Sequence, residues 1–190
     1  MVVAGNSVLS DFLSLADVFF ASLASVVPVV VLPGETDPSN FALPQQPIHS
    51  AIFGRAKTYM NLHPTTNPAR FDIDGVKFLG SSGQGVREIQ WYTECGVLES
   101  LQLSLASRLL APTAPDTLAC YPVAGEVDPL VIQEAVDVFF AGNCKEVAIG
   151  KVGENSETLL VGLPTFAETG EAVLLNLQSR ETEVLEFRVE

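Results

Sequence analysis

The stretch from Val26 to Pro47, V-V-P-V-V-V-L-P-G-E-T-D-P-S-N-F-A-L-P-Q-Q-P, decides how the rest of the chain is arranged. Its β-branched run from Val29 to Leu32 is typical of a strand that is covered on both faces, as in a parallel sheet. The turn-rich loop Gly34-Glu35-Thr36-Asp37-Pro38 follows directly and carries two carboxylates. Because ligands of open α/β sheets bind beyond the carboxyl ends of the strands, this loop is a candidate site.

The composition indicates a single globular domain with an acidic surface. The 190 residues are enough to bury a core, and 47% of them are apolar while only 17% are charged. There are 23 acidic and 10 basic side chains, so the formal net charge is −13. Because binding to duplex phosphates requires clustered Lys and Arg, this charge argues against strong direct nucleic-acid binding and favours protein partners.

Cysteine and histidine are too sparse for a metal-binding or disulfide framework. The three cysteines, Cys95, Cys120 and Cys144, form no C-x-x-C pair, and we expect free thiols in a reducing compartment. The two histidines, His49 and His63, have no carboxylate at a spacing typical of zinc sites. We therefore predict neither a metal nor a cofactor.

The uncharged residues 18–32 do not predict a membrane span. Pro28 would end any helix there, and the segment is shorter than the roughly 20 apolar residues that cross a bilayer. No Lys or Arg precedes Arg55, so the positive start of a signal peptide is absent. These features predict a soluble intracellular chain.

The N-terminal part of the chain predicts a βαβ unit. Apolar Met1–Ala4 is expected to form a strand that ends in a turn at Gly5-Asn6. Apolar residues at helical spacing between Ser7 and Ser25 indicate a helix, and Val29–Leu32 forms the second strand. Since a strand at the first residue would have nothing before it, we expect the chain to be truncated at its N-terminus.

The next segments alternate between loops and short elements. Pro33–Pro47 is expected to be a rigid, extended loop, and Ile48–Leu62 has a weak helical pattern. Asp74-Gly75 is a turn dipeptide typical of a two-residue hairpin, and it lies between the apolar runs Arg70–Ile73 and Val76–Leu79.

The second half completes an α/β pattern. Val86–Tyr92 and Val97–Leu110 indicate helices, and Val136–Phe140 indicates a buried strand that ends in Ala141-Gly142-Asn143. Alternating runs then predict a closing β-meander of four strands, Val147–Lys151, Thr158–Leu163, Ala172–Leu177 and Val184–Val189. Together the elements predict an α/β fold, a two-sheet sandwich flanked by helices.

Three loops that follow strands are expected to converge on one crevice: Gly5-Asn6, Gly34-Glu35-Thr36-Asp37 and Gly142-Asn143. Their order is similar to that of the metal-binding loops of calcineurin-like metallophosphoesterases, a resemblance that implies the fold of that family. Its members hold two metal ions with Asp-x-His, Gly-Asp-x-x-Asp, Gly-Asn-His-Asp/Glu, a single His and Gly-His-x-His. Two metals activate a water and hold the phosphate, which requires that dense set of ligands.

Most of the ligands that this resemblance implies are replaced. Asn6 and Leu9 stand where the second motif requires Asp, and Glu35-Thr36 stands where the third requires Asn-His. Asn143-Cys144-Lys145 takes the place of the last His pair, and of the expected ligands only Asp37 remains. The resemblance therefore implies a vestigial pocket that has no catalytic and no metal-binding residues.

Three longer motifs resemble the family of small accessory (B) subunits of DNA polymerase delta. They are L-P-G-E-T-D-P-S-N-F-A-L-P-Q-Q-P-I-H (Leu32 to His49), D-G-V-K-F-L-G-S-S-G-Q (Asp74 to Gln84) and A-P-T-A-P-D-T-L-A-C-Y-P (Ala111 to Pro122). The resemblance extends from Val29 to about Leu177. It implies one inactivated phosphoesterase domain over residues 1–190, whose preceding OB-fold domain and first strand are absent.

The resemblance also implies a role in DNA replication in the nucleus. Small subunits of this family are non-catalytic scaffolds that hold the catalytic subunit and, on another side, a third subunit that links to the sliding clamp. An acidic surface suits basic partner segments. Two alternatives stay open, namely a degenerate but active metal-dependent phosphoesterase or nuclease, and an interaction domain with no polymerase partner.

Some residues allow both a functional and a structural interpretation. Glu35 and Asp37 could form a general acid/base pair, although a turn that bonds backbone amides is favoured. Gly80–Gly85 could cradle a phosphate, but it lacks the P-loop Lys, so a plain loop is favoured. Trp91 and Tyr92 suit either an interface anchor or the core.

Overall fold

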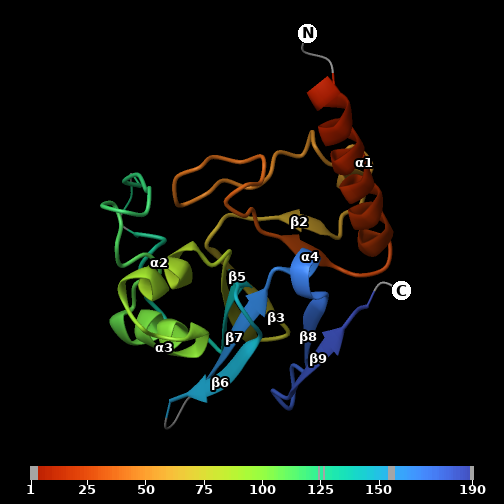
Figure 1. Ribbon diagram of the computed structural model, residues 1–190. Coiled ribbons are helices and arrows are strands. Elements are labelled where there is room, and N and C mark those ends of the chain that lie inside the picture. The colour runs from red at the N-terminus through yellow and green to blue at the C-terminus, as the bar shows by residue number, and fades with distance from the viewer. Residues whose placement is uncertain (1–3, 124, 126, 154–156, 189–190) are drawn as a thin grey trace.

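The computed structural model describes residues 4–123, 125, 127–153 and 157–188, with side chains from residue 11 onward. The chain folds into an α/β structure, as the element pattern predicted, with a mixed five-stranded sheet at its centre. The predicted two-sheet sandwich flanked by helices is present only in part, because the second layer on this sheet is a two-stranded hairpin. Two helices cover one face of this sheet and a β-hairpin covers the other (Figure 1). The first helix stands at the side of the molecule, and its N-terminal end projects away from the sheet (Figure 1).

Helix α1 (Ala4–Ala24) begins earlier than predicted and includes the residues expected to form a turn. Gly5 and Asn6 lie in its first turn, so the prediction that they form a loop after a strand is wrong. Of the predicted strand Met1–Ala4, Ala4 is helical and the other three residues lie outside the described part of the chain. No proline interrupts the segment Ala4–Ala24, so the helix can extend in this direction.

The inner face of α1 packs on the segment that follows strand β1. Phe20 meets Phe53 edge to face, with 5.7 Å between the ring centroids. Asp17 is buried, and its carboxylate accepts hydrogen bonds from the backbone N–H groups of Arg55 (2.8 Å) and Ala56 (2.9 Å). These contacts anchor the C-terminal half of α1.

The same contacts explain why Ile48–Leu62 is not the predicted helix. A single 3₁₀ turn, η1 (Ala56–Thr58), is the only helical element that the structure describes within that range. The Asp17 carboxylate takes two backbone N–H groups that a continuous helix would direct to its own carbonyls, and Gly54 weakens the helical state further.

Strand β1 (Val29–Val31) lies in a parallel pair, as predicted, but its partner comes later in the chain. It pairs with β2 (Leu62–Pro64) in the register Val29↔Leu62. The proline-rich segment 33–47 between them is an extended loop, as predicted. Isolated bridges join it to two distant segments, Leu43 to Cys120 and Gln45 to Asn67.

The five-stranded sheet has the order β3-β4-β5-β7-β6. Its strands are β3 (Ala69–Ile73), β4 (Val76–Ser81), β5 (Val138–Cys144), β6 (Ala148–Val152) and β7 (Thr158–Pro164). The central strands β4, β5 and β7 are parallel, while β3 and β6 run antiparallel at the edges. The predicted hairpin between β3 and β4 is confirmed, because Asp74 (φ 52°) and Gly75 (φ 81°) both take the positive φ of a type I′ turn.

The two faces of the sheet have separate apolar cores. Helices α2 (Gln84–Tyr92) and α3 (Val97–Ser107) match the predicted helices and pack on one face, where Phe139, Leu160 and Leu101 are almost fully buried. The hairpin of β8 (Glu171–Leu175) and β9 (Thr182–Glu186) packs on the other face through Val173 and Leu175.

The closing strands do not form the predicted meander of four strands. Strand β7 runs beside the distant β5, and β6 pairs on its other side, so this pair belongs to the main sheet. After β7 the short helix α4 (Phe166–Thr169) reverses the chain, and β8 pairs only with β9 among the described strands. Of the helices described, none combines the length and the apolar character that crossing a membrane requires.

The outer face of α1 exposes large apolar side chains. Phe12 is 66% exposed, Leu15 67% and Phe19 58%. Contiguous exposed apolar surface of this kind promotes self-association.

We predict that replacing Phe12, Leu15 and Phe19 together by Gln lowers the tendency of the protein to aggregate, measured by light scattering at rising concentration. The melting temperature should stay nearly unchanged, because these side chains lie outside the core. The control is Phe20→Gln on the inner face, which should lower the melting temperature because it removes the contact with Phe53. Unchanged aggregation of the triple variant would show that this face is not responsible.

Candidate functional site

A polar pocket lies beyond the carboxyl ends of four strands. It has a volume of about 370 Å³. The loop after β1 contributes Gly34, Glu35, Thr36 and Asp37, and the other walls come from Ser82, Gly83, Gln84, Arg87, Asn143 and Thr165. Ser82, Gly83, Gln84 and Arg87 follow β4, Asn143 lies near the end of β5, and Thr165 follows β7. The parallel direction of these strands places their carboxyl ends at one edge of the sheet. Topology therefore brings the loops together.

Asp37 closes the loop that contains it. Its Oδ2 accepts a hydrogen bond from the backbone N–H of Gly34 at 2.6 Å, and the N–H of Asp37 donates to the carbonyl of Gly34 at 3.3 Å. The carboxylate thus satisfies a backbone donor of its own turn. This geometry agrees with the interpretation favoured from the sequence, in which Asp37 bonds backbone amides of its own turn.

Glu35 is engaged by a side chain that the sequence did not single out. Its Oε2 lies 2.7 Å from Nη1 of Arg87 in the second turn of α2, and each side chain is 38% exposed. The guanidinium of Arg87 also lies 5.3 Å from the centroid of the Trp91 ring. A half-exposed ion pair stabilises a fold by only about 0.2–1 kcal/mol, so this contact mainly orients the three side chains.

The turn between β4 and α2 touches the end of β5 so closely that it requires glycine. Gly83 has φ +93°, and a Cβ atom there would lie 1.9 Å from the carbonyl oxygen of Gly142. Asn143, with φ +51°, donates from its Nδ2 to the carbonyl of Ser82 at 2.9 Å. The Gly80–Gly85 loop is therefore a wall of the pocket that is packed against a neighbouring strand.

A cluster of buried amide side chains lies beneath the pocket and holds its walls. We call Gln45, Asn67 and Gln84, together with the half-buried Ser82 hydroxyl, the amide cluster; Gln45 is 0% and Asn67 1% exposed. Nδ2 of Asn67 donates to Oε1 of Gln45 (2.7 Å), Oγ of Ser82 (2.6 Å) and Oε1 of Gln84 (3.1 Å). The cluster thus joins three segments that are far apart in the sequence.

The amide cluster also fixes the backbone of the proline-rich loop. Nε2 of Gln45 donates to the carbonyl of Gly34 at 2.9 Å and to that of Asn40 at 3.0 Å. The backbones of Gln45 and Asn67 exchange hydrogen bonds of 2.7 and 3.1 Å. Because Gly34 begins the loop that carries Glu35 and Asp37, the cluster determines where these carboxylates lie.

The structure brings together two of the three predicted loops. Gly34, Glu35, Thr36, Asp37 and Asn143 line the pocket, and Gly142 supports it from beneath Gly83. Gly5 and Asn6 belong to α1 instead and are not among the residues that line it. His49 and His63 are exposed elsewhere, and Trp91 and Tyr92 are exposed by 66% and 61%, so they are not core residues.

The donor set of the pocket does not fit a two-metal centre. Within the described residues, no group of three or more His, Cys, Asp and Glu side chains is placed to hold a metal ion. The two carboxylates of the pocket are engaged by the N–H of Gly34 and by Arg87. A pair of metals that activates water needs several free anionic or imidazole ligands.

Sequence reasoning missed Arg87 and Thr165 as pocket residues, and it favoured a plain loop for Gly80–Gly85, which contributes Ser82 and Gln84 to the pocket. The strand–Gly–helix order of V-K-F-L-G-S-S-G-Q-G was a usable signal for Ser82 and Gln84, because the turn after a parallel strand opens at the ligand edge. Arg87 carried no such signal, since its partner Glu35 lies 52 positions earlier in the chain.

One of the three free cysteines lies beside the pocket but in the core. Cys144 at the end of β5 is buried, whereas Cys95 and Cys120 are half-buried. Burial raises the pKa of the Cys144 thiol from 9.0 to about 11, while a backbone hydrogen bond at Leu163 acts weakly in the opposite direction. The thiol therefore stays protonated at neutral pH.

Comparison with known proteins identifies the family. The family model for the B subunit of DNA polymerases alpha and epsilon matches residues 6–148. The chain is 39% identical over 174 residues to the DNA polymerase delta small subunit of Arabidopsis thaliana and 37% identical over 174 residues to that of Oryza sativa subsp. japonica. It is 38% identical over 177 residues to DNA polymerase delta subunit 2 of Drosophila melanogaster.

These similarities cover 90–92% of the chain, so they include the pocket, the amide cluster and most of both cores. The chain belongs to the family of DNA polymerase alpha/epsilon B subunits. It spans 39–41% of the length of these three relatives.

We predict that Asn67→Asp strongly destabilises the protein although the shapes of the two side chains are nearly equal. The substitution replaces a donor that serves three acceptors with an additional buried acceptor, which should cost about 2–4 kcal/mol in the free energy of unfolding measured with urea. Asn176→Asp is the matched control, because exposed Asn176 uses only its Oδ1, as an acceptor from two backbone N–H groups. Equal stability of both variants would disprove the role of the cluster.

We predict that Cys144 reacts with iodoacetamide far more slowly than Cys95 and Cys120 at pH 8, followed by mass spectrometry of the peptides. Its folded pKa of about 11 exceeds the ordinary 9.0, so the thiol contributes stability below pH 9.0 that is lost as pH rises to about 11. Addition of urea should make all three thiols react at similar rates. Rapid labelling of Cys144 in the folded protein would contradict its burial.

Proposed function

We propose that this chain acts as a non-catalytic accessory subunit of DNA polymerase delta. In this role it would bridge the catalytic subunit and a third subunit in the nucleus during DNA replication. The observation that carries the proposal is the similarity to polymerase delta small subunits over 90–92% of the chain. The domain would be an inactivated phosphoesterase of the calcineurin-like type.

The pocket supports a non-catalytic role. It occupies the edge of the sheet at which α/β enzymes keep their ligands, yet its carboxylates are held by a turn and by an arginine. The polar side chains that line the pocket hold its loops in place and do not include a free acid/base pair. We infer that the pocket has kept its architecture and serves as a rigid part of the surface.

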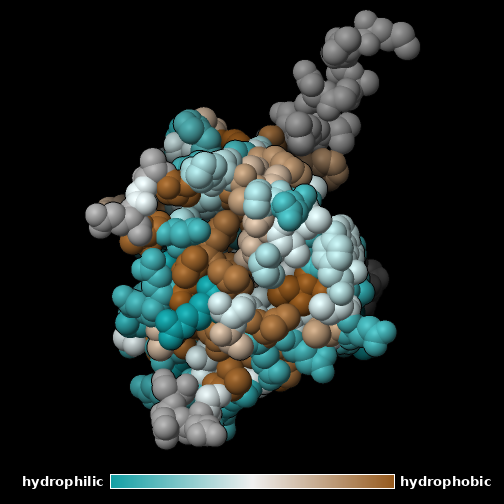
Figure 2. All heavy atoms as spheres, turned by 90° about the vertical axis from the view of Figure 1, so that its left-hand side faces the viewer, coloured by the Kyte–Doolittle hydropathy of each residue, from teal (hydrophilic) through white to brown (hydrophobic). Residues whose placement is uncertain are grey.

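The surface supports binding to proteins. The net charge of −13 disfavours phosphate backbones and suits basic partner segments. Trp91 and Tyr92 project from the C-terminal end of α2, and Trp, Tyr and Arg are the residue types most enriched at the centres of interfaces. On the face formed by the α2–α3 side, apolar groups gather among hydrophilic ones (Figure 2).

The proposal predicts that the chain co-purifies with the catalytic subunit of DNA polymerase delta when the two are expressed together. Trp91→Ala with Tyr92→Ala should weaken this association about tenfold or more, because buried aromatic anchors contribute most of the energy of an interface. Tyr59→Ala with Met60→Ala, which removes exposed apolar side chains between η1 and β2, is the control. Absence of co-purification would favour an interaction domain with another partner.

The same preparation tests the alternative of an active phosphoesterase. We expect no hydrolysis of bis(p-nitrophenyl) phosphate with Mn²⁺ above that of a buffer control. Turnover that is abolished by Asp37→Ala would show that the pocket is catalytic and would overturn the scaffold-only role.

A further inference from the structure

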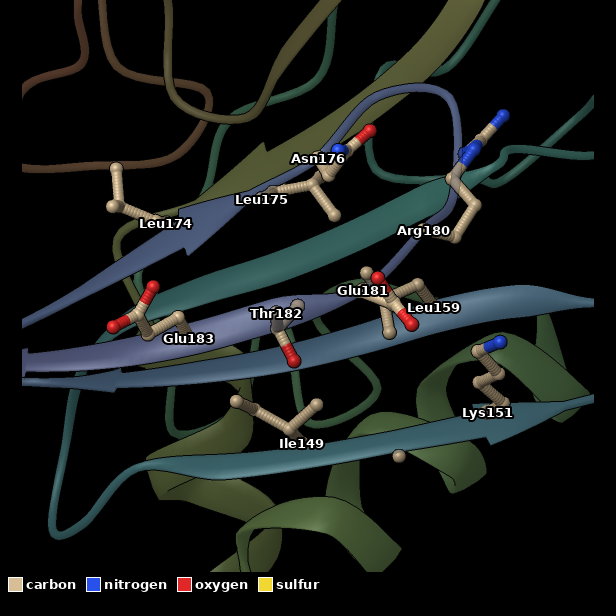
Figure 3. A pocket seen from close by; sticks show the side chains of 11 residues that line it. Ile149, Lys151, Leu159, Leu174, Leu175, Asn176, Arg180, Glu181, Thr182 and Glu183 are labelled. Carbon is tan, nitrogen blue, oxygen red and sulfur yellow. The ribbon is translucent and has the colours of Figure 1, made fainter.

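A large groove lies on the opposite side of the sheet from α2 and α3. It has a volume of about 820 Å³ and lies between the β8–β9 hairpin and the edge of the main sheet. Figure 3 shows Ile149 and Lys151 of β6 and Leu159 of β7 facing Thr182 and neighbouring residues of the hairpin. Its floor is therefore apolar and its rim is polar.

One wall of the groove is an incomplete sheet. Strand β9 pairs with β8, and within the described chain no strand pairs with its other edge. A two-stranded sheet is marginal by itself, and a free edge presents unpaired N–H and C=O groups that can bind another extended chain. The five residues of β9 contain no proline that would block such pairing.

The two faces of β9 differ in character. Thr182 lies opposite Leu175, a residue of the apolar core, so this face of β9 is directed toward the main sheet. Glu181 and Glu183 are offset from Thr182 by one residue and lie on the other face. A strand added to β9 would therefore meet an apolar surface on one side and two carboxylates on the other.

The charges of the groove leave these carboxylates available. Lys151 Nζ is 3.5 Å from Oε2 of Glu157, and Arg180 Nη2 is 3.3 Å from Oδ1 of Asp137, so both cations of the groove are engaged by carboxylates outside it. In the described part of the chain, the Glu183 carboxylate has no ion-pair or hydrogen-bond partner. That of Glu181 accepts only the Ser179 hydroxyl, at 3.1 Å.

We propose that this groove binds an extended segment of a partner protein in which Lys or Arg alternates with Val, Ile or Leu. The segment adds to β9 as a third strand, with its apolar side chains over Ile149 and Leu159 and its basic side chains beside Glu181 and Glu183. A five-residue strand is about 17 Å long, so a segment of roughly five residues fills the edge of β9. The proposal goes beyond the accessory role and does not depend on it.

The carboxylates of the groove favour a basic protein segment over two other occupants, a second copy of the chain and a nucleic acid. A second copy of the chain would bring Glu181 and Glu183 against the same acidic hairpin, and each copy has a net charge of −13. A nucleic acid would bring phosphates to the same carboxylates. A basic, alternating strand is complementary on both faces.

Binding is measured by fluorescence anisotropy with the full chain and a fluorescein-labelled peptide of three Lys-Val repeats. A peptide of three Glu-Val repeats has the same apolar content and opposite charge. We expect the Lys-Val peptide to bind, about tenfold or more tightly than the Glu-Val peptide, with an affinity that falls as NaCl is raised. Equal affinities, or no binding at millimolar peptide, would overturn the proposal.

Charge reversal locates the site. Glu181→Lys with Glu183→Lys should abolish the preference for the Lys-Val peptide. Glu94→Lys with Glu146→Lys changes the net charge equally at exposed positions outside the groove and should leave the affinity within about twofold. Circular dichroism checks that both variants fold. Equal losses in the two variants would reduce the effect to net charge and overturn the assignment to the groove.

Hydrogen exchange tests the strand addition. Saturation with the Lys-Val peptide should slow amide exchange in residues 182–186. Protection of residues 148–152 alone would place the peptide on β6 and overturn pairing with β9. Competition by a single-stranded oligonucleotide, or protection of residues 182–186 by dimerisation without peptide, would assign the groove to nucleic acid or to a second copy instead. Since no polymerase subunit is present, failure here leaves the test of the accessory role unaffected.

Discussion

The hydrogen bonds among Gln45, Asn67 and Gln84 are the constraint on which the rest of the molecule depends. Removing amide groups from water is costly unless each donor and acceptor finds a partner, so these buried side chains accept only one mutual arrangement. In that arrangement Nδ2 of Asn67 serves three acceptors and Gln45 reaches back to the loop after β1. The proline-rich loop, the start of β3 and the start of α2 are thereby locked to one another.

These hydrogen bonds determine how the polar residues of the pocket above them are arranged. Once Gly34 is held by Gln45, the turn closes on Asp37 and Glu35 reaches Arg87. Gly83 can then lie against the carbonyl of Gly142 only because it lacks a Cβ atom. The polar residues at the edge of the sheet thus stabilise loops, which is consistent with a family whose named relatives are polymerase subunits.

The errors of the sequence reasoning have a common physical cause. Gly5-Asn6 was expected in a turn because Gly and Asn favour turns, but α1 extends through them and its C-terminal half is anchored by packing on Phe53 and Ala56. Ile48–Leu62 was expected to be helical, yet the Asp17 carboxylate takes its backbone donors. In Ile48–Leu62 a tertiary contact outweighed a weak helical preference. At Gly5-Asn6 a helix that is anchored further along the chain outweighed a weak preference for a turn.

By itself the sequence determined the features that depend on neighbouring residues. The β3–β4 hairpin follows from Asp74-Gly75, the helices α2 and α3 from their apolar spacing, and the extended course of residues 33–47 from proline. Only the tertiary structure decided which loops meet and that Arg87 pairs with Glu35. It also decided that β8 and β9 form a separate hairpin in which one edge of β9 is unpaired among the described strands. These contacts join residues that are far apart in the sequence, such as Asn143 and Ser82 at a separation of 61 positions, and no local propensity encodes a partner at that distance.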